Sequence, residues 1–420
     1  MAESLCIFED DRYRKLLPLV YFRPVYDLRC GILTLREKIE RLYRVPLATL
    51  HSRAYLSASL KERNAGPILP EMKEGRCLFI NGRVLADGSL PKRIPLAGDD
   101  VVYFLGETVI AARVSGERLE RIKSRIPDVF TPGVFEGLSR DTVDATLISY
   151  PWDLVHANSS QIRADIELLA GRKKGGSGGK VYAGVHLINK RGVTIGKGSK
   201  VKPGAVLDAE EGPIFIGKNV TVFPNAVIEG PAYVGDGSFI KVGAKIYGST
   251  SIGPMCKVGG EVEGSIIHSY SNKQHDGFLG HSYLGMWVNL GADTNNSDLK
   301  NNYGNVKVTI DGETVDTHSM FVGLTMGDHS KSGINTMFNT GTVVGVSSNV
   351  FGAGFPPKSI PSFAWGGVGG MEEYDIEKSL GVARRVMARR KWEITPADEE
   401  LFRRIFELTR EERKKEGLKA

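Results

Sequence analysis

The hydrophobic positions in the second half of the chain repeat every six residues. One aliphatic residue recurs without a miss at Ile216, Val222, Ile228, Val234, Ile240, Ile246, Ile252 and Val258. An α-helix repeats its apolar face about every 3.6 residues and a strand about every two, so neither accounts for this period. A six-residue repeat is typical of a parallel β-helix, in which each short strand points one aliphatic side chain inward and the next coil stacks about 4.8 Å away.

The repeat weakens after Val258, resumes around Leu284 and ends near residue 370. The remaining residues, 371–420, have a helical pattern, with Thr395 as a helix N-cap and Pro396 at the first helical position. We therefore expect a β-helix over 181–370. We also expect a helical cap over 371–420 that covers the end of the solenoid, where strand edges would otherwise be unpaired.

Residues 1–170 follow a different pattern, in which short apolar runs alternate with amphipathic segments. The runs "SLCIFED" and "RCLFING" predict buried strands, and "LREKIERLYR" and "SSQIRADIELLA" predict helices. Strands that alternate with helices favour an α/β domain over 1–170. The following segment 171–180, "GRKKGGSGGK", is typical of a flexible linker. Because the repeat begins just after this linker, we expect few contacts to cross the boundary.

Composition narrows the class of protein. The chain is 41% hydrophobic and 25% charged, which is ordinary for a globular protein in water. It has no apolar run of the ~18 residues that a membrane helix needs, and its N-terminus lacks the order of a signal peptide. Four widely spaced cysteines suggest neither a disulfide framework nor a zinc knuckle. These features predict a cytoplasmic protein without a membrane partner.

The net charge of +6 comes mostly from the segment 1–180, which holds 28 basic and 23 acidic side chains. The Arg-rich segment 371–420 is nearly balanced, with 13 basic and 12 acidic side chains, which argues against a nucleic-acid-binding arm. The excess at the N-terminus suits either an anionic ligand such as a nucleotide or an ordinary basic surface.

The stretch "SNKQHDGFLGHSYLG", residues 271–285, interrupts the repeat. A coil that breaks its repeat extrudes a loop, and such loops often have a function. We expect a loop over 264–278 that presents His268, Lys273, His275 and Asp276. A neutral imidazole suits general-base removal of a proton from an amine or a hydroxyl. Two alternatives are an ordinary surface histidine and a zinc site of His268, His275 and His281, although their spacing lacks the close pair that such sites use.

The residues around His275 resemble the acetyltransferase half of the bifunctional N-acetylglucosamine-1-phosphate uridyltransferase/glucosamine-1-phosphate acetyltransferase family, whose fold is a left-handed β-helix. "HDGFLG" (275–280) and "NLGA" (289–292) keep the family's spacing without a gap. The resemblance implies that His275 is the general base and that Asn289 contacts the acceptor sugar, with Lys273 as a further substrate contact. It also implies an acetyl-CoA cleft formed by Asn302, Tyr303 and Lys300 between the subunits of a homotrimer.

Two positions depart from that family. Phe278 stands where the family has a tyrosine, and Glu263 stands where it has a lysine that contacts the sugar. The substrate contacts, and with them the identity of the sugar, therefore need not be those of the family.

The segment 1–170 resembles, more distantly, the nucleotidyltransferase domain of the same enzymes. In "KLLPLVYFRP" the residues Lys15 and Pro24 keep the family's spacing of nine, and "YPWDLVHAN" (150–158) resembles an element of related sugar-1-phosphate nucleotidyltransferases. The resemblance implies nucleotidyl transfer from a nucleoside triphosphate, most simply UTP, with Mg²⁺ as the metal. It also makes Lys15 and Arg23 the candidates for phosphate contacts.

This domain lacks three features of the family. The Gly-rich loop after the first strand is replaced by "EDDRYR". Arg83 stands at one of the two expected metal-binding aspartates and Leu147 at the other. Asp10 and Asp11 are the nearest substitutes as metal ligands.

The sequence therefore predicts a transferase of sugar-nucleotide biosynthesis. The expected reactions are acetyl transfer from acetyl-CoA to an amino-sugar 1-phosphate of the glucosamine-1-phosphate type, and uridylyl transfer to the sugar 1-phosphate. Two alternatives remain open. One is a nucleotidyltransferase whose β-helix serves only for trimerisation and regulation, and the other is a catalytically dead scaffold that binds sugar nucleotides.

Overall fold

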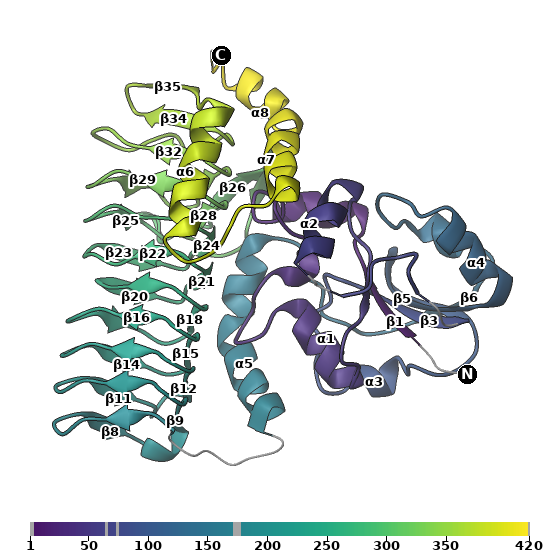
Figure 1. The fold of residues 1–420 in the computed structure, drawn as a ribbon, viewed down its shortest axis with the longest axis horizontal. Coiled ribbons are helices and arrows are strands. Elements are labelled where there is room, and N and C mark those ends of the chain that lie inside the picture. Colours follow the sequence, from purple (N-terminus) through teal and green to yellow (C-terminus); the bar gives the residue numbers. More distant parts are fainter. Residues whose placement is uncertain (1–3, 64–65, 73–74, 171–177, 419–420) are drawn as a thin grey trace.

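The computed structural model describes residues 4–63, 66–72, 75–170 and 178–418. An α/β domain and a tall parallel β-helix stand side by side, and three C-terminal helices lie near the upper end of the β-helix (Figure 1). The predicted fold class is confirmed. Most of the predicted linker 171–180 lies outside the described residues.

The α/β domain is built on one six-stranded sheet with the order β2-β1-β3-β5-β4-β6. Strand β1 pairs in parallel with β2 and β3, whereas β5 is antiparallel to both β3 and β4. The strands are β1 (Ser4–Phe8), β2 (Thr49–Leu50), β3 (Arg76–Asn81), β4 (Val101–Leu105), β5 (Thr108–Ser115) and β6 (Ser139–Thr142). The apolar runs predicted as strands are β1 and β3, and both are almost entirely buried.

Five α-helices belong to this domain: α1 (Leu35–Tyr43), α2 (Ser57–Glu62), α3 (Leu90–Arg93), α4 (Gly116–Ser124) and α5 (Pro151–Ala170). Helix α1 begins with a capping box in which Thr34 accepts a hydrogen bond from the Glu37 N–H, and the Glu37 side chain accepts one from the Thr34 N–H. The predicted helices over 35–44 and 159–170 are α1 and the second half of α5. Short 3₁₀ segments connect the elements: η1 (Asp11–Leu16), η2 (Val25–Asp27), η3 (Ala54–Leu56) and η4 (Pro132–Phe135).

The β-helix has three faces, each a stack of parallel strands. Face 1 contains β7 (Lys180–Val181), β10 (Lys200–Val201), β13 (Thr221–Val222), β16 (Phe239–Ile240), β19 (Lys257–Val258) and β22 (Asn272–Lys273). Face 2 contains β8 (His186–Ile188), β11 (Val206–Asp208), β14 (Val227–Glu229), β17 (Lys245–Ile246), β20 (Glu261–Glu263) and β23 (Phe278–Gly280). Face 3 contains β9 (Val193–Ile195), β12 (Ile214–Ile216), β15 (Ala232–Val234), β18 (Thr250–Ile252), β21 (Ile266–Ser269), β24 (Tyr283–Met286), β28 (Thr325–Met326), β31 (Val343–Val344) and β33 (Ser359–Ile360).

Shorter groups of strands continue the stack. One consists of β29 (Lys331–Ser332), β32 (Asn349–Val350), β34 (Ala364–Gly367) and β35 (Gly370–Glu373), with β35 antiparallel to β34. Another pairs β25 (Asn295–Asn296) with β30 (Met337–Phe338). Bridges from Asn272 to Asn289 and from Asn289 to Lys331 join face 1 to the first of these groups.

The six-residue repeat places its aliphatic residues in the interior. On face 1, Val201 lies over Val222, which in turn pairs with Ile240, and all three are fully buried. On face 3, Ile216 pairs with Val234, which lies three repeats further along the chain. Each coil thus covers the apolar surface of the next, so the interior is one continuous hydrophobic column.

The interruption at 271–285 is a shortened coil, and the expectation of an extruded loop over 264–278 is wrong. Strands β21, β22 and β23 all continue the faces here, but the coil from Val258 to its partner Lys273 is shorter than three full repeats. The segment that leaves the stack comes later, between Asp298 and Val322, and contains the hairpin of β26 (Lys307–Ile310) and β27 (Glu313–Asp316). The coil that starts at Leu284 therefore reaches its partner Met326 only after this excursion.

The α/β domain covers face 3 of the β-helix, and the two parts share one hydrophobic cluster. Helix α5 runs along this face (Figure 1), and its Asn158 donates a hydrogen bond to the Ser249 carbonyl. The backbone N–H of Arg29 donates to the Tyr283 hydroxyl 2.9 Å away. The expectation that few contacts cross the boundary is therefore wrong, because the N-terminal residues cover apolar side chains of face 3.

The last helices are α6 (Ile376–Ala388), α7 (Pro396–Leu408) and α8 (Arg410–Lys415). Thr395 caps α7 with Pro396 in the first turn, as predicted. The helices lie along the flank of the upper coils, where Phe402 packs on Phe22 of the α/β domain. The helices therefore cover the side of the solenoid, whereas we expected them to cover its end. Leu418, after α8, does pack against the interior column. None of the helices among the described residues is long and apolar enough to span a membrane.

Candidate functional site

His275 lies at the corner where face 1 turns into face 2. It follows β22 and precedes β23, and its side chain is exposed. No side chain or backbone group in the described part of the chain forms a hydrogen bond to its imidazole. An open hollow of about 320 Å³ adjoins it, lined by Lys241, Val242, Gly260, Gln274, His275, Asp276, Ala292 and Asp293. The corner therefore presents an unpartnered imidazole beside room for a ligand.

Lys273 fixes this corner from inside the solenoid. It pairs with Val258 at a position that aliphatic residues occupy in the other coils, and its side chain is only 2% exposed. Its ammonium donates a 2.7 Å hydrogen bond to the His275 carbonyl. Burial lowers the pKa of Lys273 to about 8. The structure thus corrects the expectation of a substrate contact, because Lys273 points inward and holds the turn.

Asn289 lies on the outer surface of face 1, one coil above Asn272. Its side-chain oxygen accepts a hydrogen bond of 3.3 Å from Asn272, which itself accepts one from Arg390. Asn289 therefore faces the segment after α6 and is absent from the lining of the His275 hollow. The structure does not bring the predicted base and the predicted sugar contact into one pocket of a single chain.

The residues expected at the acetyl-CoA cleft begin the excursion from the stack. Lys300 donates to the Asn305 carbonyl, and Asn302 accepts a hydrogen bond from the Gly304 N–H. Tyr303 is 69% exposed. These residues follow β25, whereas His275 precedes β23, so the width of face 2 separates them within one chain.

A second histidine lies at the edge of face 2 where the excursion begins. The Nδ1 atom of His281 is 2.7 Å from a carboxylate oxygen of Asp298, and the ring packs on Phe321 with 5.0 Å between centroids. A Cβ on Gly264 would lie 3.1 Å from Nε2 of His281, so a glycine there leaves room for the ring. A carboxylate that binds one imidazole nitrogen orients the other for proton transfer.

The sequence pattern does not single out this pair. The signal was the coil length, because Asp298 follows His281 at the same interval that separates Asn272 from the stacked Asn289. His268 joins neither histidine at the surface. It is buried, its Nε2 lies 2.9 Å from the Asp27 carbonyl, and burial lowers its pKa well below the usual range.

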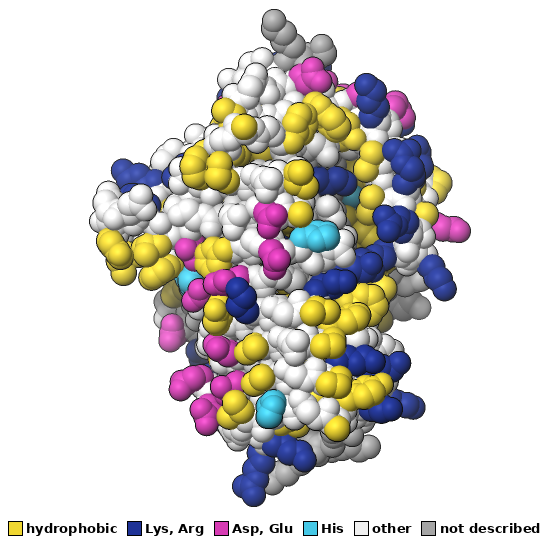
Figure 2. All heavy atoms as spheres, turned by 90° about the vertical axis from the view of Figure 1, so that its left-hand side faces the viewer, with side chains coloured by type: hydrophobic (Ala, Val, Ile, Leu, Met, Phe, Trp, Pro, Cys, Tyr) yellow, Lys and Arg dark blue, Asp and Glu magenta, His cyan; other side chains and the backbone are white. Residues whose placement is uncertain are grey.

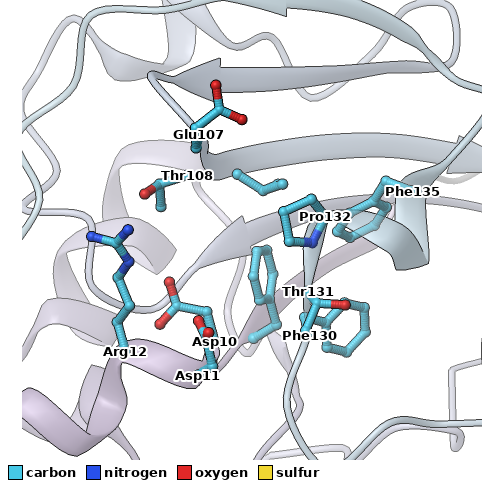
Figure 3. Close-up of a pocket in the computed structure, with 11 residues that line it drawn as sticks. Asp10, Asp11, Arg12, Glu107, Thr108, Phe130, Thr131, Pro132 and Phe135 are labelled. Atoms are coloured by element: carbon cyan, nitrogen blue, oxygen red, sulfur yellow. The ribbon is translucent and has the colours of Figure 1, made fainter.

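The α/β domain has a small pocket at the carboxyl end of β1, which is the edge where open α/β sheets bind ligands. Figure 3 shows Asp10, Asp11 and Arg12 on one side of it and the segment from Phe130 to Phe135 on the other. Its volume of about 160 Å³ is below the ~300–1,000 Å³ of typical small-molecule sites.

The expected magnesium ligands do not form a metal site in this pocket. The carboxylate of Asp10 is bound by Arg83 at 2.8 and 2.6 Å and by the Asn81 amide at 2.8 Å. Arg83 is 1% exposed and also donates to the Ile148 carbonyl. A guanidinium thus neutralises the carboxylate that would bind the cation, and Asp11 alone remains exposed. Among the described residues, no group of three or more His, Cys, Asp or Glu could hold a metal ion.

The two residues expected to contact phosphate, Lys15 and Arg23, differ in whether their charged groups are free. Arg23 is buried and forms a two-point ion pair with Asp328 of the β-helix, so it joins the two parts of the chain and is not free to bind a phosphate. Lys15 is half-buried, with its ammonium 5.3 Å from the centre of the Tyr150 ring. Of the two, Lys15 alone remains a candidate.

Residues 5–174 match the model of the sugar nucleotidyl transferase family. Over this segment the chain is similar to sugar nucleotidyl transferases. It is 30% identical over 155 residues to the bifunctional protein GlmU of Rippkaea orientalis, and the match covers 36% of this chain and 29% of the relative. It is 26% identical over 205 residues to the bifunctional protein GlmU of Synechococcus elongatus, covering 44% and 41%. The chain thus spans less than half the length of these GlmU-like relatives.

Similarity to solved structures is weaker. The UDP-N-acetylglucosamine acyltransferase of Francisella novicida is 16% identical with a TM-score of 0.31, over 56% of this chain and 78% of that one. The corresponding enzyme of Campylobacter jejuni is 13% identical with a TM-score of 0.27, over 54% and 96%. Neither likeness is close enough to support a function. The GlmU-like relatives and the family model agree with the prediction of a transferase.

Proposed function

We propose that this GlmU-like chain is an acyltransferase of sugar-nucleotide biosynthesis that moves an acetyl group from acetyl-CoA to an amino-sugar 1-phosphate. The observation that supports this most is the exposed, unpartnered imidazole of His275 beside an open hollow. An imidazole that forms no internal hydrogen bond keeps a lone pair available for a proton.

In the proposed reaction, His275 removes a proton from the amino group of the sugar as its nitrogen attacks the thioester carbon. A C–N bond forms and the C–S bond breaks, so that the electron pair leaves with the CoA sulfur. The proton then passes from the imidazolium to the thiolate, and the products are the amide and free CoA. Lys273 contributes by positioning, since its ammonium holds the carbonyl of the residue that carries the base.

The proposed assembly is a homotrimer in which His275 of one subunit meets Asn302 and Tyr303 of its neighbour. Two observations support it. The width of face 2 separates these residues within one chain, so an active site that contains both needs two chains. The adjacent faces also differ in charge. Lys200, Lys241 and Lys257 lie along face 1. Face 2 carries Asp208, Glu229, Glu261 and Glu263, together with Lys245, which pairs with Glu261.

Figure 2 shows the basic side chains along one side of the solenoid and the acidic ones along the other. A basic face that packs on the acidic face of the next copy makes a head-to-tail contact, and such contacts close into rings. Complementary charges favour and orient this packing.

Uridylyl transfer by the α/β domain is the second candidate, and the match of residues 5–174 to sugar nucleotidyl transferases favours it. The pairing of Asp10 with Arg83 opposes a magnesium-dependent version of this reaction. We therefore place acetyl transfer first. In this proposal the α/β domain binds a sugar nucleotide more readily than it catalyses a reaction of that nucleotide.

A substrate screen tests the proposed acetyl transfer. The full chain would be incubated with acetyl-CoA and, separately, glucosamine 1-phosphate, glucosamine 6-phosphate or galactosamine 1-phosphate, and the release of CoA thiol followed. We expect release that depends on an amino-sugar 1-phosphate. Release that is no faster with any sugar phosphate than without one contradicts the proposal. Light scattering of the same sample tests the trimer separately.

A further inference from the structure

A cavity of about 800 Å³ lies where the α/β domain, the excursion hairpin, the upper coils and the C-terminal helices meet. Its walls come from the segment around η1, the turn between β26 and β27, strands β31 and β33, and helices α7 and α8. The volume is within the range of ~300–1,000 Å³ for small-molecule sites and is several times that of the pocket at the sheet edge. None of the residues considered above as sites lines it.

Polar contacts between distant segments hold these walls together. Arg14 of η1 binds Asp311 of the hairpin turn at 2.7 and 3.1 Å. The Tyr21 hydroxyl donates to Glu412 of α8, and the same carboxylate accepts a hydrogen bond from the Ser362 N–H at 3.3 Å. The cavity is therefore bounded by fixed contacts on at least two sides.

One wall of the cavity is aromatic and consists of Tyr13, Tyr21 and Tyr55. The guanidinium of Arg53 lies 4.2 Å from the centre of the Tyr13 ring and 5.3 Å from that of Tyr55. The Tyr55 hydroxyl donates to the Tyr21 carbonyl at 3.2 Å. These contacts fix the rings. Arg53 already covers one face of Tyr13 and of Tyr55, so an organic cation would bind at a ring face left open to the cavity.

The charged groups of the lining are mostly acidic. The cations are Arg14, Arg404 and Lys415, and the carboxylates are Asp128, Asp311, Glu411, Glu412 and Glu416. Arg14 is paired with Asp311, and Glu411 is paired with Lys414. Without these pairs, the lining keeps three carboxylates and two cations. The carboxylates are Asp128, Glu412 and Glu416, and the cations are Arg404 and Lys415. The cavity therefore disfavours a ligand that is only anionic.

Glu412 is a lining carboxylate that accepts hydrogen bonds from two neutral donors, the Tyr21 hydroxyl and the Ser362 N–H. No lysine or arginine among the described residues pairs with this half-buried carboxylate. Burial raises its pKa above the usual range, and the carboxylate of Asp311 raises it further. A carboxylate withdrawn from water without a cationic partner is costly, so a cation in the cavity would stabilise it.

We propose that this cavity is a binding site for a small hydroxylated primary amine, with the ammonium held by Glu412 and the tyrosine rings. Hydroxyl groups of the ligand would reach the polar groups of Thr309, Ser359 and Asp128, which also line the cavity. The site is separate from the His275 corner and does not depend on the proposed acetyl transfer.

Isothermal titration of the full chain tests the proposal, with glucosamine as the probe and N-acetylglucosamine as its neutral counterpart. We expect glucosamine to bind with one site per chain and at least tenfold more tightly than N-acetylglucosamine, because acetylation removes the positive charge. Failure of glucosamine to bind, or equal binding of the two sugars, overturns the proposal.

Variants locate the binding. Glu412→Gln keeps an acceptor for the Ser362 N–H but removes the charge, and it should weaken glucosamine binding at least tenfold. Glu407→Gln changes an exposed carboxylate of α7 outside the cavity and should leave binding unchanged. Ser359→Trp fills the cavity from its β-helix wall and should abolish binding even if Glu412→Gln fails to fold. Binding that survives both Glu412→Gln and Ser359→Trp, in folded proteins, overturns the assignment.

Discussion

The guanidinium of Arg83 and the carboxylate of Asp10 form a two-point ion pair at the carboxyl end of the N-terminal sheet, with Nε–Oδ1 at 2.8 Å and Nη2–Oδ2 at 2.6 Å. Arg83 stands where the resembled family has an aspartate that binds magnesium. An internal salt bridge therefore lies where the resemblance implies a metal-binding carboxylate.

The first prediction concerns this pair. Arg83→Ala leaves a buried carboxylate without its cation, which costs about 3–5 kcal/mol in the free energy of unfolding. Urea unfolding measures the change, and Arg12→Ala, at an exposed arginine of the same pocket, is the matched control with an expected change below about 0.5 kcal/mol. A loss as small as that of the control would show that the pair contributes nothing.

A related prediction is that the same pair makes magnesium unimportant for the α/β domain. We expect pyrophosphate release from UTP to be slow and no faster when magnesium is added, because no cluster of carboxylates among the described residues receives the ion. Fast, magnesium-dependent release that disappears in Asp11→Ala would restore nucleotidyl transfer as the main reaction.

The second prediction compares His275 and His281, which lie at the two edges of face 2. His275→Ala should lower kcat/KM for acetyl transfer by about 10²–10⁴-fold, which is the usual contribution of a general base. His281→Ala should cost far less. His318→Ala, at a histidine of the excursion whose side chain is 85% exposed, is the neutral control.

The opposite ranking would be informative. Suppose that His281→Ala and Asp298→Asn both lose activity and His275→Ala does not. The general base is then His281, oriented by Asp298 at 2.7 Å. In that case the reaction does not need a site shared between the subunits of a trimer. The split between kcat and KM in Asp298→Asn separates a role in proton transfer from a structural one, since loss of the orienting carboxylate should lower kcat and leave KM unchanged.

The third prediction is a pH dependence of stability caused by Lys273. Burial lowers its pKa to about 8, whereas an unfolded lysine titrates near about 10.4. Between these two values the unfolded state binds more protons, so stability from this group rises with pH. Relative to Lys273→Met, the wild type should gain about 2 kcal/mol between about pH 8 and pH 9.5.

Urea unfolding at several pH values gives this difference. Below about pH 8 both states are protonated, and the difference between wild type and variant should be constant. Lys218→Met, at an exposed corner lysine, controls for a general loss of positive charge. A difference between wild type and Lys273→Met that stays constant from about pH 7 to pH 9.5 would show that Lys273 is not held in a buried position.

The fourth prediction is that the fragment 178–420 does not fold as a soluble unit. Its Ile266, Tyr283 and Trp287 are buried in the cluster shared with the α/β domain. Truncation also leaves Asp328, whose pKa is raised by burial, without Arg23. Light scattering and circular dichroism of the fragment measure the outcome. A stable, monodisperse fragment would show that face 3 does not need its cover.

The sequence by itself determined the β-helix, because a six-residue period leaves one geometry in which every aliphatic residue points inward. It determined the start of α7 in the same way, since Thr395 and Pro396 satisfy local requirements of a helix N-terminus. The repeat did not determine the position of His275, which we expected on an extruded loop and which lies at a corner of a shortened coil, because nothing local distinguishes a shortened coil from an outward loop.

Only the tertiary structure decided which charged residues are free. Arg23 and Lys273 have ordinary neighbours in the sequence, yet one is paired with a carboxylate 305 residues away and the other points into the solenoid. The same holds for Arg83 with Asp10 and for His281 with Asp298. Hydrogen bonds and ion pairs act over a few ångströms in space, and sequence spacing reports that distance only within a helix, a strand or a regular coil.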